Sequence, residues 1–210
     1  MAHDPARLGD ALRHLRRADP VLGGLIARIG PCHLRVDRRG SAYAALVEAI
    51  QYQQITGAAA AAIHRRLTLL LGSSYPRPHD VAAVTDVQLR GAGLSRQKIA
   101  YLRDLTRRAQ DGLPLGRLGR LPDEEVIEAL TQVKGIGRWT AEMLLIFRLG
   151  RLDVLPVHDY GIRKAMQRAY GMRGLPKPDR MRRLSECWRP YRTVACWYLW
   201  RSIGGAAGKA

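Results

Sequence analysis

Two glycines separated by one residue, Gly135 and Gly137 in the stretch VKGIGRWTAE, form a motif with a possible chemical use. Glycine permits left-handed backbone angles and has no side chain to block a close approach. If a helix begins at Arg138, its first amide groups point outward with the positive end of the helix dipole, an arrangement that binds phosphate. Lys134 and Arg138 would add charge, and Thr140 could add a hydroxyl. The alternative is an ordinary turn between two helices, which the spacing alone does not exclude.

The charge balance of the chain favours the phosphate interpretation. Its 210 residues include 35 Lys and Arg against 18 Asp and Glu, a formal net charge of +17. Most of the basic residues are Arg, whose planar guanidinium suits bidentate contacts with phosphate. An arginine-rich genome could explain the preference for Arg over Lys, but not the shortage of acids. We therefore expect a polyanionic partner, and nucleic acid is the usual one.

Cysteine usage and hydropathy restrict the other classes. The chain has only three cysteines, far apart in sequence: Cys32, Cys187 and Cys196. An odd and scattered set does not form a disulfide framework, so we expect a reducing compartment. There is no Cys-x-x-Cys pair, and the histidines do not cluster with cysteines, so we expect neither zinc nor a four-cysteine iron–sulfur cluster. The first 20 residues have no apolar core typical of a signal peptide, and no apolar run is long enough to span a bilayer. These features predict a cytoplasmic protein without a membrane partner.

The elements that would position the glycine pair are helices. Nearly every segment has apolar residues at helical spacing, and no convincing run alternates with period two. Helices at 123–133 and 138–149 would flank the glycines, and acidic residues suit the start of the first. The other expected helical segments are a first helix stopped at Asp19-Pro20, and segments within 21–36, 41–52, 56–72, 81–89, 95–111, 159–171 and 180–203. We expect an all-helical protein of about ten helices, in two lobes with a groove between them.

At this level of detail the chain resembles a known superfamily. LTQVKGIGRWTAEMLLIF resembles the helix–hairpin–helix of the DNA glycosylases that carry a Gly/Pro-rich loop and a distal aspartate, and LDVLPVHDYGIRKAM resembles that loop and aspartate. AIQYQQITGAAAAAIHRRL and GLSRQKIAYLRDLTRRA resemble segments of the 3-methyladenine glycosylase II branch. WRPYRTVACWYLWR resembles the terminal helix of that branch. The resemblance covers residues 41–203 in order, and agreement of separate segments makes it specific.

The resemblance implies a fold and a partner. It implies one compact helical glycosylase domain over 1–210, with the helix–hairpin–helix at about 123–149 and the N- and C-terminal helices in one lobe. We expect no room for the additional β-rich N-terminal domain of some members. The implied partner is double-stranded DNA containing alkylated bases, bound by a monomer without a cofactor.

The resemblance also implies a catalytic carboxylate, and Asp159 is the residue that falls on it. From its sequence context alone, Asp159 would be assigned as a helix N-cap. The two roles are compatible, because cleavage of an N-glycosidic bond through an oxocarbenium-like state needs a fixed negative charge near the sugar. Asp159 could also orient the attacking water. Asp153 is the rival carboxylate, and we expect it to be structural because it precedes the extended Leu155-Pro156 segment.

Trp139 distinguishes two kinds of glycosylase. In members that also cleave the strand, the equivalent position after the hairpin is a lysine nucleophile. Tryptophan offers no amine to form a Schiff base with the sugar. Lys134 precedes the glycines, at a position that resembles a variable one. We therefore expect a monofunctional enzyme that leaves an abasic site.

A flipped base needs aromatic walls, and a cationic base is attracted to the negative face of a ring. Trp139 and Met143 lie four residues apart on one helical face and could line a pocket; the resemblance adds Trp200, and we include Tyr160 beside the aspartate. Met143 replaces a tyrosine of a relative, so the damage preference can differ. Three further aromatic residues are expected in the core or an interface, namely Trp188, Trp197 and Tyr198.

DNA contacts are expected from the hairpin and from a break in the helix after Tyr52. Gln54 could fill the duplex position vacated by the flipped base, and polar filling of a loop is the alternative. The family often binds a monovalent cation with main-chain carbonyls, here near Val133 and Gly135. The expected DNA-contacting residues are Lys134, Gly135, Ile136, Gly137, Arg138, Thr140, Gln53 and Gln54. A diffuse basic surface is expected from Arg96, Lys98, Arg103 and Arg107.

The resulting hypothesis is a monofunctional DNA glycosylase of base excision repair that hydrolyses the N-glycosidic bond of alkylated purines such as 3-methyladenine. One alternative is a non-catalytic helix–hairpin–helix module that only binds DNA, for which no carboxylate is needed at position 159. Another alternative is a glycosylase for a different class of lesion. The missing cysteine cluster and the missing lysine argue against those other branches.

Overall fold

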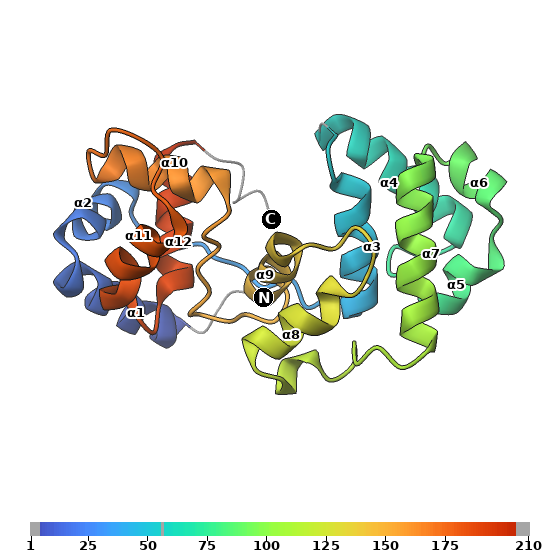
Figure 1. Cartoon of the computed structure of the whole chain (residues 1–210), viewed down its shortest axis with the longest axis horizontal. Coiled ribbons are helices and arrows are strands. Elements are labelled where there is room, and N and C mark those ends of the chain that lie inside the picture. Colours follow the sequence, from blue (N-terminus) through green and yellow to red (C-terminus); the bar gives the residue numbers. More distant parts are fainter. Residues whose placement is uncertain (1–4, 56, 205–210) are drawn as a thin grey trace. The chain divides into compact units, whose positions relative to one another are not determined.

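The computed structural model describes residues 5–55 and 57–204, and the regular elements of this part of the chain are helices (Figure 1). The prediction of an all-helical protein is therefore confirmed. The backbone divides into two compact units, one of residues 1–37 with 145–210 and one of residues 38–144. The extreme ends of the expected domain, 1–4 and 205–210, lie outside the described residues.

The unit of residues 38–144 is built around the long helix α7. Its elements are α3 (Ala42–Tyr52), α4 (Gly57–Leu71), α5 (Pro78–Ala83), α6 (Asp86–Gly91), α7 (Arg96–Gln110), the 3-10 turn η1 (Leu118–Arg120), α8 (Asp123–Thr131) and most of α9 (Arg138–Phe147). Helix α7 packs against α3, α5 and α6 through its buried apolar face, which includes Ile99, Leu102 and Leu105. Tyr43 on α3 and Thr106 on α7 add a buried hydroxyl–hydroxyl hydrogen bond of 2.7 Å.

The prediction of a single helix over 81–89 is wrong, because parts of two short helices, α5 and α6, occupy this segment. The backbone is extended at Val84, and the Thr85 side chain caps the new helix α6 by accepting a hydrogen bond from the Gln88 amide. Gln88 bonds back to the Thr85 amide, which completes a capping box. Arg103 on α7 donates to two carbonyls at the end of α5. This arginine was expected on a diffuse basic surface, but its guanidinium serves a structural role.

The second unit combines helices from the N-terminal and the C-terminal parts of the chain. Its elements are α1 (Pro5–Ala18), α2 (Pro20–Ile29), α10 (Tyr160–Ala169), α11 (Pro178–Leu184), the 3-10 turn η2 (Ser185–Trp188) and α12 (Arg192–Ser202). Helix α12 packs against α1, α2 and α10. All residues from Thr193 to Trp200 are buried, so this helix is covered on every side. Trp188, Trp197 and Tyr198 are at most 3% exposed, which confirms them as core residues.

Asp19 connects the N-terminal helices of this unit to Tyr170 and Trp188 in its C-terminal part. As expected from its position before Pro20, it ends α1; its Oδ1 atom also accepts from two amides at the start of α2. Its Oδ2 atom accepts from the Tyr170 hydroxyl at 2.6 Å and from the Trp188 indole at 2.7 Å. A carboxylate that is 6% exposed is tolerated here because it accepts four hydrogen bonds.

Candidate functional site

The carboxylate of Asp159 is held at the start of helix α10. Asp159 has extended backbone angles and caps the helix, with its Oδ1 atom accepting from the Ile162 amide at 2.7 Å. The same oxygen accepts from the Trp200 indole Nε1 at 2.9 Å. Hydrogen bonds to a carboxylate are stronger than those between neutral groups, so two of them fix its orientation. The expectation of an N-cap at Asp159 is confirmed, and Trp200 is its second partner.

Gly161 is a functional candidate that the sequence did not reveal. A Cβ atom at this position would lie 3.0 Å from Asp159 Oδ1 and 3.1 Å from Trp200 Cδ1. Both contacts are closer than a side chain normally makes, so glycine lets the carboxylate and the indole meet over the first turn of α10. A glycine directly after Asp-Tyr at the start of a helix was the available signal, because glycine is otherwise unfavourable there.

Trp200 and Tyr160, both expected in a base pocket, have different environments. Trp200 is 4% exposed, and its ring lies 6.0 Å from that of Phe147, measured between centroids. Tyr160 follows Asp159 directly and is 66% exposed. Trp200 therefore positions the carboxylate, whereas Tyr160 offers an exposed ring next to it.

Asp153 is structural, as the sequence predicted. Its carboxylate accepts from Arg192 at 2.7 and 3.0 Å and from Arg189 at 2.8 Å. Arg192 also donates to the Asp153 carbonyl. These ion pairs connect the segment before Asp159 to the start of α12.

The hairpin between α8 and α9 has the geometry that its glycines suggested. Gly135 has φ +80°, and a Cβ atom there would overlap the ring of Tyr101. The Ile136 amide donates to the Val133 carbonyl at 3.0 Å, and the Ile136 side chain is buried. A Cβ atom at Gly137 would meet nothing within 4 Å. The fold therefore requires glycine at 135, whereas the space beside Gly137 is open.

Asp104 anchors the hairpin from α7. Its buried carboxylate accepts from the Lys134 amide at 2.9 Å, from Arg107 at 2.8 Å and from Arg108 at 3.0 Å. Burial alone would raise the pKa of Asp104, but the hydrogen bonds from Lys134, Arg107 and Arg108 lower it to about 2. Arg107, expected on a diffuse basic surface, thus belongs to a network that fixes the hairpin.

The charged and hydroxyl groups expected at the phosphate site differ in availability. Arg138 forms a bidentate pair with Glu124, at 2.6 and 2.9 Å, and a third bond to Glu142 at 3.1 Å. These contacts raise the pKa of Arg138, and the hydrogen bonds to Glu124 contribute more than the one to Glu142. Thr140 is buried, whereas Lys134 is exposed. Of the three, Lys134 is best placed to meet a phosphate; the contacts of Arg138 and Thr140 stay predictions.

Trp139 and Met143 lie on α9, one turn apart. Trp139 is 47% exposed and Met143 is partly exposed, so both present surface outside the core. They belong to the unit of residues 38–144, whereas Asp159, Tyr160 and Trp200 belong to the other unit. A base pocket formed from all five residues therefore stays a prediction.

The loop after α3 is joined to the hairpin. Gln53 Nε2 donates to the Gly135 carbonyl at 2.9 Å, and Gln54 has φ +57° and is exposed. The carbonyls of Val133 and Gly135 thus each accept one hydrogen bond. A carbonyl has two lone pairs, so the expected monovalent cation stays a prediction.

Within residues 5–55 and 57–204, no three His, Cys, Asp or Glu side chains are grouped to hold a metal ion, and the three cysteines are free thiols. No helix in the same ranges combines the length and the apolar character needed to cross a membrane.

Comparison with known proteins decides the family. Residues 47–190, which include both the hairpin and Asp159, match the model of the HhH-GPD superfamily base excision DNA repair proteins. The chain belongs to the HhH-GPD superfamily. Its relatives include an alkylbase DNA glycosidase-like protein from Schizosaccharomyces pombe, 30% identical over 91% of this chain and 92% of that protein. DNA-3-methyladenine glycosylase 1 from the same organism is 37% identical over 76% of this chain and 72% of its own length.

Solved structures of HhH-GPD proteins agree with the fold. A 3-methyladenine DNA glycosylase from Schizosaccharomyces pombe in complex with abasic DNA superposes with a TM-score of 0.80 and 35% identity, over 94% of this chain and 98% of that chain. A DNA-3-methyladenine glycosidase from Bacillus halodurans has a TM-score of 0.84 and 34% identity, over 97% and 92% of the two chains. The resemblance to the 3-methyladenine branch is thereby confirmed.

Proposed function

We propose that this HhH-GPD protein is a DNA glycosylase of base excision repair that removes alkylated purines such as 3-methyladenine by hydrolysis. The observation that carries the proposal is the Asp159 carboxylate, held by the Ile162 amide and the Trp200 indole at the start of α10. A module that only binds DNA has no need of a carboxylate held in this way. The names of the relatives support the same substrate class.

The proposed reaction uses one carboxylate. Water attacks C1′ of the flipped nucleotide while the C1′–N bond breaks, and the electron pair of that bond returns to the base. A purine nucleotide methylated at N3 or N7 carries a positive charge before this step, so its base leaves as a neutral molecule without a strong acid. One proton of the water is released as the sugar gains its hydroxyl. Asp159 would stabilise the oxocarbenium-like transition state by its charge and orient the water.

DNA binding is proposed to centre on the hairpin. The open space beside Gly137 would admit a phosphate to the first turn of α9, and the exposed Lys134 would add charge. The exposed ring of Trp139 would then stack with the flipped base. Such a protein would act in the compartment that contains the DNA.

We further propose that the enzyme does not cleave the DNA strand. This proposal rests on tryptophan at 139, where an amine would be needed to form a Schiff base with the abasic sugar. A labelled duplex should be cut only after hot alkali, and borohydride should trap no covalent protein–DNA complex. Strand cleavage without alkali would contradict the proposal.

The decisive experiment compares the wild type with Asp159→Asn on methylated DNA and on duplexes containing 7-methylguanine, ethenoadenine or hypoxanthine. Asparagine can keep both hydrogen bonds at Oδ1 and removes the negative charge, so the fold and DNA affinity should be retained. Release of 3-methyladenine should fall at least about 100-fold. No release of any base by the wild type would favour a non-catalytic binding protein, whereas release of hypoxanthine alone would indicate a different lesion class.

A further inference from the structure

A groove of about 710 Å³ in the unit of residues 38–144 is lined by segments that are far apart in sequence. Its walls include residues 52–55 at the end of α3 and in the loop after it, residues from 93–98 before and within the first turn of α7, and Gly135 with Trp139. The rings of Tyr52 and Trp139 are 39% and 47% exposed at this groove. Two side-chain-to-backbone hydrogen bonds join these walls.

The first of these bonds comes from Gln53. Its Nε2 atom donates to the Gly135 carbonyl at 2.9 Å, which joins the loop after α3 to the hairpin across 82 positions of sequence. Gln53 is the first residue beyond α3, with φ −59° and ψ 132°. Its amide is therefore directed at protein backbone, although the sequence suggested a DNA contact.

The second bond comes from Lys98. Its Nζ atom donates to the Gln51 carbonyl at 2.6 Å, in the last turn of α3, where helix carbonyls lack partners within the helix. Removal from solvent lowers the pKa of Lys98. The ammonium group of the partly buried Lys98 is thus bonded to the end of α3 at the wall of the groove, and it links α7 to α3.

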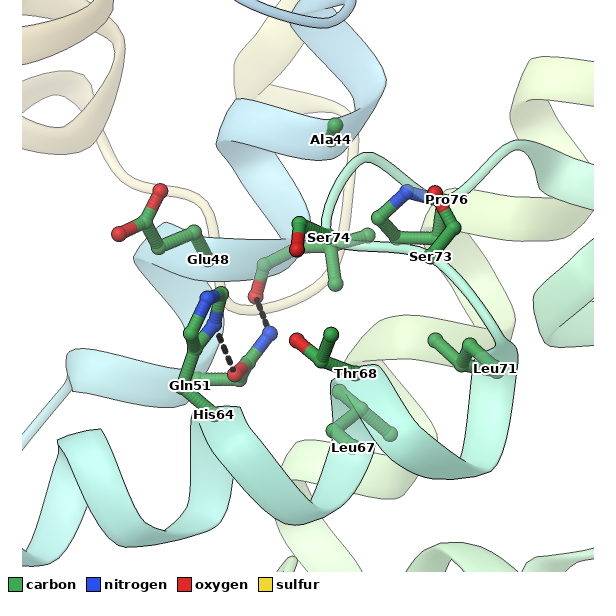
Figure 2. Close-up of a pocket in the computed structure, with 11 residues that line it drawn as sticks. Ala44, Glu48, Gln51, His64, Leu67, Thr68, Leu71, Ser73, Ser74 and Pro76 are labelled. Atoms are coloured by element: carbon green, nitrogen blue, oxygen red, sulfur yellow. Dashed lines mark hydrogen bonds between the residues drawn. The ribbon is translucent and has the colours of Figure 1, made fainter.

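The end of α3 is also fixed from its other side. The Gln51 side chain is 2% exposed, and its Nε2 atom donates to the Val47 carbonyl at 3.1 Å. The Oε1 atom of Gln51 lies 3.2 Å from His64 Nδ1. Because an amide oxygen can only accept a hydrogen bond, His64 Nδ1 is the donor in this pair. Figure 2 shows Gln51 and His64 bonded at the wall of a cavity of about 10 Å³, room for about one water molecule. Lys98 thus attaches to the last turn of α3, where the Gln51 side chain is also held by hydrogen bonds.

We propose that Gln53 and Lys98 are positioning residues that hold the loop carrying Gln54 in a fixed relation to the hairpin, and that neither contacts a DNA phosphate. Gln54 directly follows Gln53 and has φ +57°, a conformation that residues other than glycine rarely adopt. Holding it in this conformation before DNA arrives would spare the cost of ordering the loop on binding. This inference rests on the proposed DNA binding.

The test for Lys98 uses the salt dependence of DNA affinity. A side chain that contacts a phosphate releases a counterion, so its loss reduces the slope of log affinity against log salt by about 0.9. Lys98→Met should weaken binding to a duplex with an abasic-site analogue about tenfold while the slope stays that of the wild type. Lys134→Met is the matched variant, since Lys134 is the exposed lysine of the hairpin. It should reduce the slope.

The test for Gln53 needs no DNA. In the free protein, Gln53→Ala should speed hydrogen exchange of hairpin amides such as that of Ile136, because the Gly135 carbonyl loses its partner. Gln110→Ala, at the exposed end of α7, is the matched control and should leave this exchange unchanged. If Lys98→Met does not fold, Gln53→Ala still tests the proposal.

The experimental outcomes distinguish failure of the positioning roles from failure of the proposed function. A reduced slope for Lys98→Met, or unchanged hairpin exchange in Gln53→Ala, would overturn the positioning roles even if the wild type binds and repairs DNA. Failure of the wild type to bind the abasic duplex would instead overturn the proposed function. Unchanged slope together with faster hairpin exchange would support the positioning roles.

Discussion

The indole nitrogen of Trp200 donates to the Oδ1 atom of Asp159 at 2.9 Å, across 41 positions of sequence. Trp200 is buried in α12, and its ring lies beside Phe147. A residue that the sequence placed on the wall of a base pocket therefore orients the carboxylate. Because this partner of Asp159 is a rigid ring buried in the core of its unit, that core helps to set the direction of the carboxylate.

Removing only the indole donor should impair chemistry more than folding. In Trp200→Phe the ring beside Phe147 is largely kept, and the hydrogen bond to Asp159 is lost. We expect single-turnover excision to slow about 10- to 100-fold, the range for losing a hydrogen bond to a charged group. Affinity for an abasic-analogue duplex should be unchanged. Trp197→Phe, on the same helix, is the control, and an equal loss of rate in both variants would contradict the assigned role.

A methyl group at position 161 should separate stability from activity. Gly161→Ala places a Cβ atom 3.0 Å from Asp159 Oδ1, so the carboxylate or the Trp200 ring must shift by a few tenths of an ångström. Alanine also favours the helix by about 1 kcal/mol. We expect a higher or equal melting temperature and slower excision. Gly24→Ala in α2, where a Cβ atom meets nothing within 4 Å, should leave excision unchanged.

The two hairpin glycines should respond differently to alanine. In Gly135→Ala a residue with a side chain must adopt φ +80°, and its Cβ atom overlaps the Tyr101 ring. The free energy of unfolding should therefore fall by more than about 1 kcal/mol. Gly137→Ala meets no protein atom within 4 Å, so stability should be kept. Its DNA affinity should nevertheless fall, because the added methyl group lies where a phosphate would approach. Denaturant unfolding and fluorescence anisotropy measure the two effects; normal DNA affinity in Gly137→Ala would count against the phosphate site.

The Asp104 network should contribute to stability in a pH-dependent way. The folded pKa of Asp104, about 2, lies below its ordinary value of 3.8. Its contribution is therefore complete above pH 3.8 and is lost as the pH falls toward 2; the shift corresponds to about 2 kcal/mol. The difference in unfolding free energy between wild type and Asp104→Asn should be largest near about pH 7 and shrink below about pH 3. An equal difference at both values would show that the charge is not responsible.

Local signals in the sequence determined most of the helices and the ends of several. Ser41, Ser95 and Asp159 stand before apolar helical patterns, and each caps a helix in the structure; the cap at Asp159 was predicted. The hairpin was also predictable, because a glycine pair between two helical patterns leaves few backbone conformations. Between 81 and 89 the helical pattern was misleading, because the Thr85 capping box interrupts it. Capping depends on hydrogen bonds over three residues, which hydrophobic periodicity does not report.

Only the tertiary structure decided which side chains meet. Asp104 lies 30 residues before the Lys134 amide that it accepts from, and Gln53 lies 82 residues before Gly135. Nothing in their local sequence marks these pairs, since they depend on how α3 and α7 pack beside the hairpin. The sequence by itself established the superfamily resemblance, the carboxylate at 159 and the tryptophan in place of a lysine, because these are properties of single positions within motifs. Tertiary contacts decided the orientation of that carboxylate and the hydrogen bonds that Asp104 and Gln53 make with the hairpin. These features require atoms from distant segments to approach within hydrogen-bonding distance.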